Sequence, residues 1–418
     1  MDTNDKFILL LNENDKTAIR KTEKELGTSI TSSAELSSKV RANDILNSGN
    51  SLHLKNLGIV IIDKEAEEKI SKFSLKRSST IKYYEKSRLI FRPVAELELI
   101  EKIRKSAEDS LQNIRDLEDY LRSKQNQNND RFTWGLNAIK MNETDLDGQD
   151  VDICILDTGF YKEHPDFVGR DISGKSFVPN QLWEDDRNGH GTHCTGTAAG
   201  FKSSENGIRY GLASGARIAI GKVLDDEGNG ATDWILDGLD NCIEKNYKVI
   251  SMSLGAPVGI GEAPNPIFEH VGNMALQNNC LIIAAAGNDS NRPGLPRPVS
   301  MPANSESFMA VAALEKSLKV ADFSNGGINV SNGGKIDVSA PGVGVYSSYS
   351  PNALGNKLYA SLNGTSMATP HVAGLAALYF QAFPTLSASD IWRKLEKRAK
   401  QLNNQQIRDV GNGLVQAI

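Results

Sequence analysis

The chain has 418 residues, of which 39% are hydrophobic and 24% charged, and its formal net charge at pH 7 is -5. This balance is ordinary for a globular protein, and the length suits two or three domains, or one large α/β domain with an appendage. The net negative charge argues against a general nucleic-acid-binding protein, whose binding domain is usually basic.

We expect no segment that would direct the chain into a membrane or out of the cell. Met1 is followed by DTNDKF rather than by a basic and then an apolar stretch, which argues against a secretory signal. The longest apolar runs, FILLL and LIIAAA, are too short to cross a bilayer. The four cysteines form no CxxC pair, which predicts buried free thiols in a reducing compartment; they are Cys154, Cys194, Cys242 and Cys280. The prediction is therefore a cytoplasmic protein.

The first 130 residues are rich in charge. They hold 23 of the 47 Lys+Arg and 22 of the 52 Asp+Glu residues. The run KFILLLNEN predicts a strand, and DKTAIRKTEKELG predicts a charged helix that ends at Gly27. LGIVIIDKEAEEKISKF repeats this strand-and-helix plan, and STIKYYEKSRLIF adds further strand. Residues 1–94 are therefore predicted to form a small α+β domain.

A long helix and a linker are predicted to follow, over residues 95–131. From Leu97 to Leu121, apolar residues recur every three or four positions, which predicts one apolar stripe on an amphipathic helix. The polar run RSKQNQNNDR, at 122–131, is typical of a flexible, cleavable linker. The stripe favours a helix packed on the surface of the next domain, and a spacer or partner-binding element is the alternative.

Residues 132–418 alternate between apolar strands and amphipathic helices. VDICILD, ARIAIGKVL, KVISMSLG, CLIIAAAGN, FMAVAAL and IDVSAPG lack polar alternation, which is typical of strands buried on both faces of a parallel sheet. ATDWILDGLDNCIEKN and NPIFEHVGNMALQNN predict crossover helices. The fold class is therefore α/β, an open parallel sheet with helices on both faces. Functional groups in such a sheet gather beyond the carboxyl ends of the strands.

Three polar segments occupy such places. Asp157 ends VDICILD, His190 lies between glycines in NGHGTHCTGTAAG, and Ser366 lies in NGTSMATPHVAG. An aspartate, a histidine and a serine that converge can form an oriented base and a nucleophile. The spacing of the three residues along the chain leaves their convergence open.

Six motifs together resemble those of the subtilisin-like serine proteases, the subtilases. They are DTG, HPDF, NGHGTHCTGTAAG, SMSLG, AAAGN and NGTSMATPHVAG, and they occur in the order Asp, His, Ser. The resemblance covers about Trp134 to Ala382 and implies that family's open parallel sheet. More loosely, the first region resembles the subtilase propeptide, which acts as an intramolecular chaperone and inhibitor.

The resemblance implies a role for each of these residues. Ser366 attacks the scissile carbonyl, His190 takes and returns the proton, and Asp157 orients the imidazole and stabilises its charged form. Asn288, in AAAGN, donates to the oxyanion together with the Ser366 amide. The helix that starts near Ser366 points its positive end at the reacting carbon. Pro370 is expected in the first turn of that helix, where its missing N–H needs no partner.

Substrate-binding residues are implied as well. Ser253, Leu254 and Gly255 would form one wall of the cleft, where an extended peptide can add as a strand. Asp289 would lie at the rim of the primary pocket and Ser300 near its floor. A carboxylate at that rim favours a lysine or arginine before the cut, by about 1 kcal/mol or less.

The resemblance implies no cofactor for catalysis but leaves room for a structural calcium ion. Asp166, in HPDF, matches a position that supplies a calcium ligand in many subtilases, and a carboxylate with backbone carbonyls suits this ion. The loop expected to complete that site reads FKSSENGIRYG, which departs from the usual pattern.

The sequence thus predicts a serine endopeptidase made as a self-inhibited zymogen. Its expected partners are a peptide or protein substrate and its own propeptide, with no nucleic acid and no membrane, and we expect a monomer. The expected task is intracellular processing or peptide maturation. The alternative is a non-catalytic or permanently inhibited protease fold that binds peptides.

Other hydrolase patterns fit this chain less well. A pepsin-like aspartic protease needs a second DTG or DSG, an α/β-hydrolase needs GxSxG, and a zinc protease needs HExxH. His193 is therefore expected to be structural rather than a metal ligand. His371 is expected to be a helix residue with a hydrogen-bonded ring, and Cys194 a small buried side chain.

Overall fold

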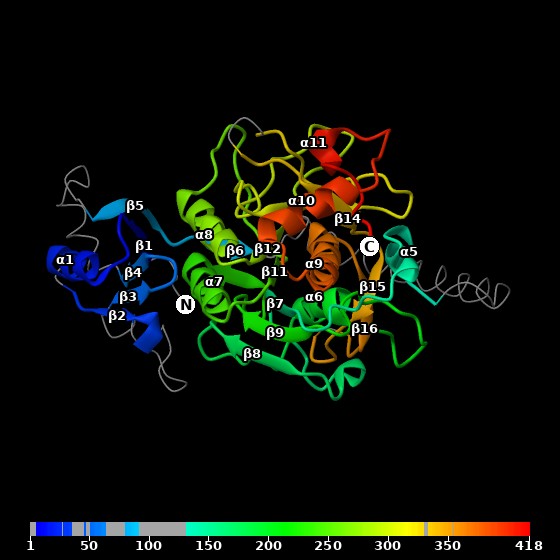
Figure 1. Ribbon diagram of the computed structural model, residues 1–418, viewed down its shortest axis with the longest axis horizontal. Helices are drawn as coiled ribbons and strands as arrows, with labels where there is room; N and C mark the ends of the chain where they lie inside the picture. Colours follow the sequence, from blue (N-terminus) through cyan, green and yellow to red (C-terminus); the bar gives the residue numbers. More distant parts are fainter. Residues whose placement is uncertain are drawn as a thin grey trace.

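Figure 1 shows the computed structural model, which describes residues 6–26, 28–35, 46, 51–63, 80–91, 131–329, 333–353 and 355–418. The described residues up to 91 are called the N-terminal region below, and those from 131 onward the C-terminal region. Within these ranges, no helix has the length and apolar character needed to cross a bilayer. The helix predicted over 95–121 and residues 122–130 of the predicted linker lie outside the described residues. The domain boundaries stay predictions.

A seven-stranded sheet, in the order β14-β13-β12-β11-β7-β9-β8, forms the centre of the C-terminal region. All of its neighbouring strands pair in parallel, as the apolar runs predict. The edge strand β8 carries no such signal because its sequence, ISGKS, is polar and partly exposed. The strands are β7 (Asp152–Asp157), β8 (Ile172–Ser176), β9 (Arg217–Lys222), β11 (Val249–Met252), β12 (Leu281–Ala285), β13 (Met309–Leu314) and β14 (Val338–Pro341).

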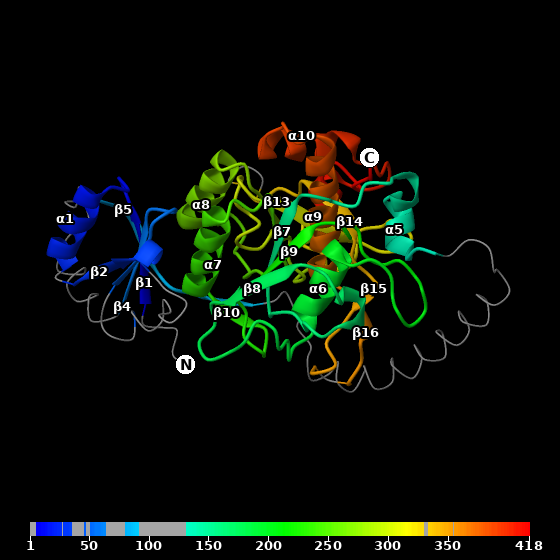
Figure 2. The ribbon, with the colours of Figure 1, turned by 60° about the horizontal axis from the view of Figure 1, so that its bottom comes forward.

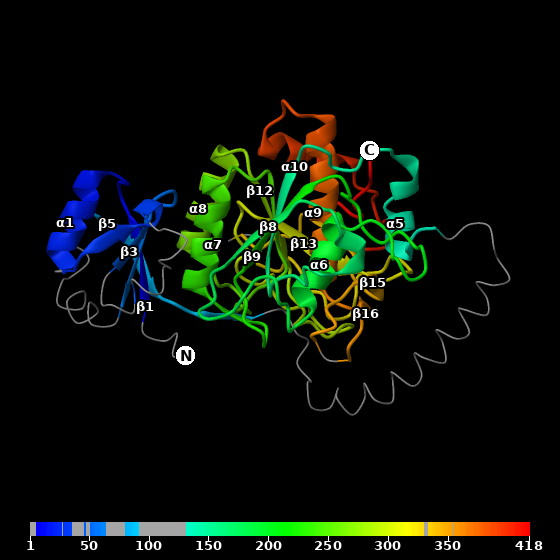
Figure 3. The ribbon, with the colours of Figure 1, turned by 90° about the horizontal axis from the view of Figure 1, so that it is seen from below.

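Side chains along the strands alternate between two cores. On β7, Ile153 and Ile155 join one core, whereas Cys154 and Leu156 join the other. Figures 2 and 3 show the sheet between two pairs of helices that cover these cores. The pairs are α6 (His190–Ala199) with α9 (Thr365–Ala382), and α7 (Thr232–Glu244) with α8 (Pro266–Gln277). The predicted open α/β sheet with helices on both faces is therefore confirmed.

A separate five-stranded sheet, in the order β2-β3-β4-β1-β5, forms the N-terminal region. One face carries Phe7 and Leu9 and packs under α1 (Lys16–Leu26), whereas Ile8 and Leu10 on the other face join the core of α7 and α8. Figure 1 shows this region beside those two helices. The strands are β1 (Lys6–Leu11), β2 (Ile30–Ser32), β3 (Ser51–Leu54), β4 (Ile59–Asp63) and β5 (Ile81–Lys86). These elements confirm the predicted α+β character.

Two carboxylates of α7 are hydrogen-bonded to the N-terminal region. Lys6 Nζ lies 2.7 Å from Asp233 Oδ2, and Ser87 Oγ donates to Asp233 Oδ1 at 2.9 Å. Asp240 Oδ1 accepts the backbone N–H of Asn56 at 2.9 Å. Both aspartates are only 2% exposed. Because a buried carboxylate is costly without partners, these contacts favour the docked arrangement of the two regions.

A short strand also joins the two regions. β6 (Leu89–Phe91) pairs antiparallel with β10 (Asn229–Ala231), and Ile90 lies opposite Gly230. Ile90 is fully buried and shares a core with Ala231 and Trp234 of the C-terminal region. The sequence predicts strand at LIF, but no local pattern identifies its partner.

The remaining elements lie around the central layers. The helix α10 packs on α9, and β15 pairs antiparallel with β16 beside α6. They are α5 (Trp134–Ala138), α10 (Ala388–Arg398), α11 (Ile407–Val410), β15 (Val345–Ser348) and β16 (Tyr359–Leu362). The four cysteines are free and buried, as predicted.

The helices α6 and α9 approach each other closely at a glycine. A Cβ atom on Gly374 would lie 2.6 Å from the Ala198 carbonyl oxygen and 2.7 Å from Leu212 Cβ. Such distances are below ordinary contact, so a larger residue would force the helices apart. The contact matters for the site because these two helices carry His190 and Ser366 near their amino ends.

Gly374→Ala should destabilise the protein by about 1–3 kcal/mol through overpacking, although alanine is the better helix former by about 1 kcal/mol. Urea denaturation measures the change, with Gly259→Ala as the control. At Gly259 the nearest atom to a new Cβ is Glu262 Oε2, at 3.4 Å. A neutral or stabilising Gly374→Ala would contradict the close helix packing.

Candidate active site

Asp157 and His190 meet where a strand ends and a helix begins. Asp157 is the last residue of β7, and His190 is the first residue of α6. His190 Nδ1 lies 2.7 Å from Asp157 Oδ1, and the Thr158 amide donates to the same oxygen at 2.7 Å. Asp157 is fully buried and His190 is 6% exposed. An ionised Asp157 accepts from Nδ1, which leaves Nε2 to act as the base.

Ser366 lies close to this pair at the start of α9, of which it is the second residue. The thiol sulfur of Cys194 connects the two places, since it lies 3.8 Å from His190 Nδ1 and 3.5 Å from the Ser366 carbonyl oxygen. Ser366 Oγ donates a long hydrogen bond, 3.4 Å, to the Ser253 carbonyl oxygen. The structure therefore brings together the three residues on which the sequence analysis relied.

Pro370 lies deeper in α9 than the sequence analysis expected. The helix begins at Thr365, so Pro370 falls in its second turn, and the prediction of a first-turn proline is wrong. The N–H that proline lacks would have bonded to the carbonyl of Ser366, four residues earlier. That carbonyl accepts instead from Ser253 Oγ at 2.7 Å. The proline thus leaves the Ser366 carbonyl available to tie α9 to the end of β11.

Asn288 is held beside Ser366 by the residue between them. Its Oδ1 accepts from both the backbone N–H and the hydroxyl of Thr365, each at 2.9 Å. A Cβ atom on Gly364 would lie 3.2 Å from Asn288 Nδ2, so glycine leaves space for the amide nitrogen there. These contacts orient a side-chain N–H donor next to the serine.

The segment of Ser253, Leu254 and Gly255 follows β11 directly and is buried. A Cβ atom on Gly255 would lie 2.9 Å from the Met301 carbonyl oxygen, so the segment packs closely on its neighbour. The Ala256 amide then donates to that same Met301 oxygen at 2.8 Å. Ser253 contacts Ser366 through both its hydroxyl, which donates to the Ser366 carbonyl oxygen, and its own carbonyl oxygen, which accepts from Ser366 Oγ.

Asp289 is exposed, but its carboxylate is held by two polar groups. Asn325 Nδ2 donates to Asp289 Oδ2 at 2.9 Å, and Ser300 Oγ donates to the same oxygen at 3.4 Å. Asn325 is fully buried, and its own Oδ1 accepts the Asp289 amide at 2.9 Å. The sequence analysis missed Asn325, which stands alone in FSNGG and belongs to no motif.

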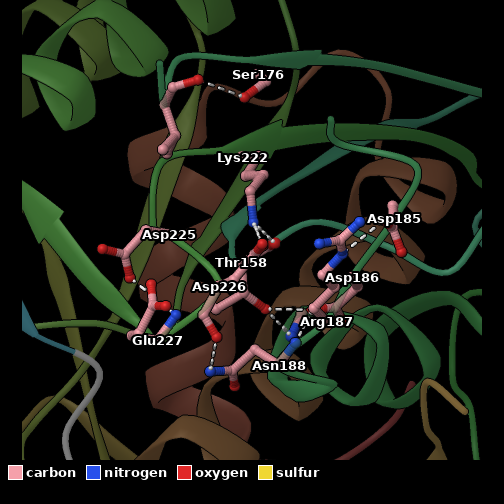
Figure 4. Close-up of polar contacts among 12 residues, drawn as sticks. Thr158, Ser176, Asp185, Asp186, Arg187, Asn188, Lys222, Asp225, Asp226 and Glu227 are labelled. Atoms are coloured by element: carbon pink, nitrogen blue, oxygen red, sulfur yellow. Dashed lines mark hydrogen bonds and ion pairs between the residues drawn. The ribbon is translucent and has the colours of Figure 1, made fainter. Parts of the chain in front are cut away.

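A buried carboxylate that belongs to none of the sequence motifs, that of Asp186, supports the start of α6 (Figure 4). Asp186 is fully buried and accepts from the hydroxyl of Thr158, next to Asp157, at 2.9 Å. It also accepts from the Gly189 amide at 2.9 Å and from the Thr192 amide at 2.8 Å. One carboxylate thereby ties the end of β7 to the first turn of α6, where negative charge is favourable.

His193, His371 and Cys194 have the structural surroundings that the sequence analysis expected. His193 Nε2 bonds to the Val345 carbonyl at 2.8 Å, and burial lowers the pKa of His193 to about 3. His371 Nδ1 bonds to the Met367 carbonyl at 2.8 Å, and burial lowers its pKa to about 4. Burial raises the pKa of the Cys194 thiol well above its usual value, so this group stays neutral at physiological pH.

The surroundings of Asp166 do not fit a calcium site. Its Oδ2 accepts from the Tyr210 hydroxyl at 2.7 Å, and its Oδ1 accepts from the Tyr359 hydroxyl and the Ser204 amide, both at 2.8 Å. Calcium requires oxygen acceptors, whereas these three partners are donors aimed at the carboxylate. Hydrogen bonds therefore fasten the loop around Ser204 in the place where the resemblance implied a metal.

EDTA should leave the unfolding midpoint unchanged, and added calcium should not raise it, because donors already saturate Asp166. Tyr359→Phe should lower the free energy of unfolding by about 1–3 kcal/mol, since it removes a hydrogen bond to a charged group. Tyr346→Phe is the matched control, because Tyr346 stacks on Tyr359 but its hydroxyl bonds to the neutral side chains of Ser203 and Asn206. A fall of several degrees in EDTA would contradict this account.

Comparison with known proteins agrees with this geometry. Residues 148–413 match the model of the Subtilase family. The chain is 36% identical to subtilisin DY of Bacillus licheniformis over 269 residues, which is 64% of this chain and 90% of that protein. It is 37% identical to thermitase of Thermoactinomyces vulgaris over 257 residues, 62% of this chain and 84% of that protein.

A third relative extends the match slightly. Subtilisin BL of Lederbergia lenta is 37% identical over 287 residues, which cover 68% of this chain and 96% of that protein. The family match spans well over half of the chain and includes every residue of the site described above. The chain belongs to the Subtilase family and is a serine-type endopeptidase.

Proposed function

We propose that Asp157, His190 and Ser366 are the catalytic triad of this endopeptidase. The 2.7 Å contact between His190 Nδ1 and Asp157 is the observation that carries the proposal, because it leaves Nε2 as the base. Ser366 Oγ attacks the scissile carbonyl, and His190 takes its proton and later passes it to the leaving amine. Asp157 holds the tautomer and stabilises the imidazolium that forms.

The oxyanion of the tetrahedral intermediate is assigned to two donors. A Cβ atom on Gly364 would lie 3.2 Å from Asn288 Nδ2 and 3.5 Å from the Ser366 amide nitrogen, so both donors face the same space. The contacts of Thr365 hold the Asn288 amide in place. The positive end of α9 adds a favourable field for the developing charge. Donors fixed in advance need no reorganisation during the reaction, which is why they lower the barrier.

The N-terminal region is proposed to be an inhibitory propeptide. Its sheet covers α7 and α8, and its strand β6 occupies the edge of β10. β6 runs antiparallel to β10, toward the turn at 225–228, and the Asp226 carbonyl in that turn accepts Asn188 Nδ2 at 3.0 Å. Asn188 lies two residues before His190. A segment of this chain therefore uses an edge beside the triad that a substrate would use.

The same observations bear on the biological role and on the alternative. We propose a monomeric cytoplasmic zymogen that is cut between the two regions and then processes peptides or proteins. A non-catalytic fold is disfavoured, because the triad and Asn288 are all present. A permanently inhibited protease has the same site, and only the fate of the N-terminal region separates it from a zymogen.

Ser366→Ala should abolish self-cleavage and serine labelling. We expect wild-type protein, incubated at neutral pH, to lose an N-terminal fragment cut between residues 122 and 131, whereas Ser366→Ala stays whole. Intact-mass measurement over several hours follows both proteins. A serine-reactive fluorophosphonate should label only the wild type, at Ser366.

Each outcome has a distinct meaning. A wild type that does not cleave itself, and that stays unlabelled even after limited proteolysis has removed the N-terminal region, would overturn the proposed triad. A wild type that is labelled only after such proteolysis supports an enzyme activated by another protease. Cleavage in both proteins would point to a contaminating protease.

The primary pocket is proposed to favour a basic residue before the cut. Asp289 is exposed, and Asn325 and Ser300 hold its Oδ2 in place at the surface. An exposed charge pair with a substrate lysine or arginine contributes about 1 kcal/mol or less.

Asp289→Asn should reduce kcat/KM for peptides with lysine or arginine before the cut by about two- to fivefold. Peptides with leucine at the same position should change by less, because they make no charge pair. A peptide panel that varies this position measures both, at low ionic strength, where an exposed charge is least screened. Equal rates for basic and leucine peptides in the wild type would contradict the proposed preference for a basic residue before the cut.

A further inference from the structure

The end of strand β9 holds a buried cation beside the site. Lys222 is the last residue of β9, and the parallel register places it next to Asp157 at the end of β7. Its side chain is fully buried. Its Nζ donates to the Thr158 carbonyl, one peptide unit from Asp157, at 2.5 Å, and to Asp226 Oδ1 at 2.8 Å. Figure 4 shows a dashed line from the ammonium to each of these two acceptors.

Asp226 belongs to a tight turn that leads into β10. The Gly228 amide donates to the Asp225 carbonyl at 3.0 Å, and the Asn229 amide donates to Asp225 Oδ1 at 2.8 Å. The Asp226 carbonyl accepts Asn188 Nδ2 at 3.0 Å, which ties the turn to the loop that precedes His190. The side chain of Asp226 is 23% exposed, so the lysine of this ion pair is buried while the aspartate is partly accessible to solvent.

Three functional parts are therefore linked through the ion pair of Lys222 and Asp226. They are the strand end that carries Asp157, the loop before His190, and the edge strand β10, on which β6 is paired. Moving the turn at 225–228 would shift β10 relative to the triad. Small displacements of this kind can cost a protease much of its rate, because the scissile bond must lie within reach of the serine.

The charge of Lys222 gives a second reason for its position beside Asp157. Asp157 is fully buried, and its Oδ2 accepts no hydrogen bond from nitrogen or oxygen within the described residues. A buried carboxylate is costly without a compensating charge or donors. Lys222 lies alongside it in the sheet, and water screens the partly exposed Asp226 more than the buried ammonium. The ammonium that binds the Thr158 carbonyl is thus a buried positive charge one peptide unit from Asp157.

We propose that Lys222 and Asp226 are positioning residues for peptide cleavage, which hold the peptide-binding edge β10 in register with the triad. Neither side chain touches the reacting atoms. The inference rests on the proposed triad and goes beyond it, because it assigns the alignment of extended substrates to an ion pair behind the site. Short substrates that do not reach β10 should need Asp226 much less than long peptides do.

The test compares two substrates that share the residue before the cut. A six-residue peptide can pair with β10, whereas an N-acetylated single amino-acid ester cannot reach it. Asp226→Ala should raise KM for the peptide about tenfold and change kcat/KM for the ester by less than about twofold. Asp226→Asn keeps an oxygen for Lys222 Nζ and should recover most of the peptide KM. Lys222→Met should lower kcat on both substrates, since it also frees the Thr158 carbonyl.

Arg217→Met is the matched control. Arg217 begins the same strand and pairs with Asp152 on β7 at 2.7 Å, at the end of the sheet away from the site. It should leave both substrates unchanged. Every variant is prepared as the full-length protein and activated in the same way as the wild type. Fluorophosphonate titration of a sample then counts the reactive serines, and rates are expressed per reactive serine.

The outcomes separate this proposal from the triad. A wild type that is not labelled at Ser366 overturns the triad itself. If the wild type is labelled, an unchanged peptide KM in Asp226→Ala, or an equal loss on both substrates, overturns the positioning role. The same KM effect in Arg217→Met would also overturn it. If Lys222→Met does not fold, the comparison of Asp226→Ala with Asp226→Asn decides alone.

Discussion

The hydrogen bond between His190 and a fully buried Asp157 is the contact on which the arrangement of this site depends. A carboxylate without solvent must be matched by donors, and its partner must sit at a fixed distance and angle. The parallel sheet meets this demand by ending β7 at Asp157 and starting α6 at His190. The two ends then need rigid supports, which Asp186, Thr158 and Lys222 provide.

The serine is placed by a different device. α9 runs through one core and packs against α6, so Ser366 takes its position from a helix that cannot shift alone. Pro370 deprives the Ser366 carbonyl of its helical partner, and Ser253 supplies the replacement. The start of α9 is thus tied to the end of β11 through the Ser366 carbonyl and to Asn288 through Thr365. The contacts that stabilise the packing of α9 are therefore the same ones that position Ser366.

Much of this architecture can be predicted from the sequence because the relevant signals are local. Apolar runs without polar alternation predict buried parallel strands. Short motifs identify Asp157, His190, Asn288 and Ser366 as candidate site residues. The supporting residues could not be predicted in the same way. Asp186, Lys222 and Asn325 lack a motif of their own, and their roles depend on partners brought together only by folding.

Two sequence-based expectations failed for related reasons. Pro370 was expected in the first turn, but helix boundaries depend on long-range contacts, and here the helix starts at Thr365. Asp166 resembles a calcium ligand by its motif, yet a carboxylate accepts hydrogen bonds as readily as it binds a metal. Tyr210 and Tyr359, distant in the sequence, decide between these outcomes. A motif specifies a side chain and leaves its partner open.

The pairing of β6 with β10 makes the occupancy of this strand edge independent of the protein concentration. Both strands belong to one chain, so the occupied fraction of this edge does not change when the protein is diluted. A single cut between the two regions would turn the same contact into a bimolecular one, whose occupancy falls as the pieces separate. Tethered segments commonly reach effective concentrations in the millimolar range, far above those of free proteins in a cell. One hydrolysed bond can therefore change the accessibility of the edge without altering any contact within it.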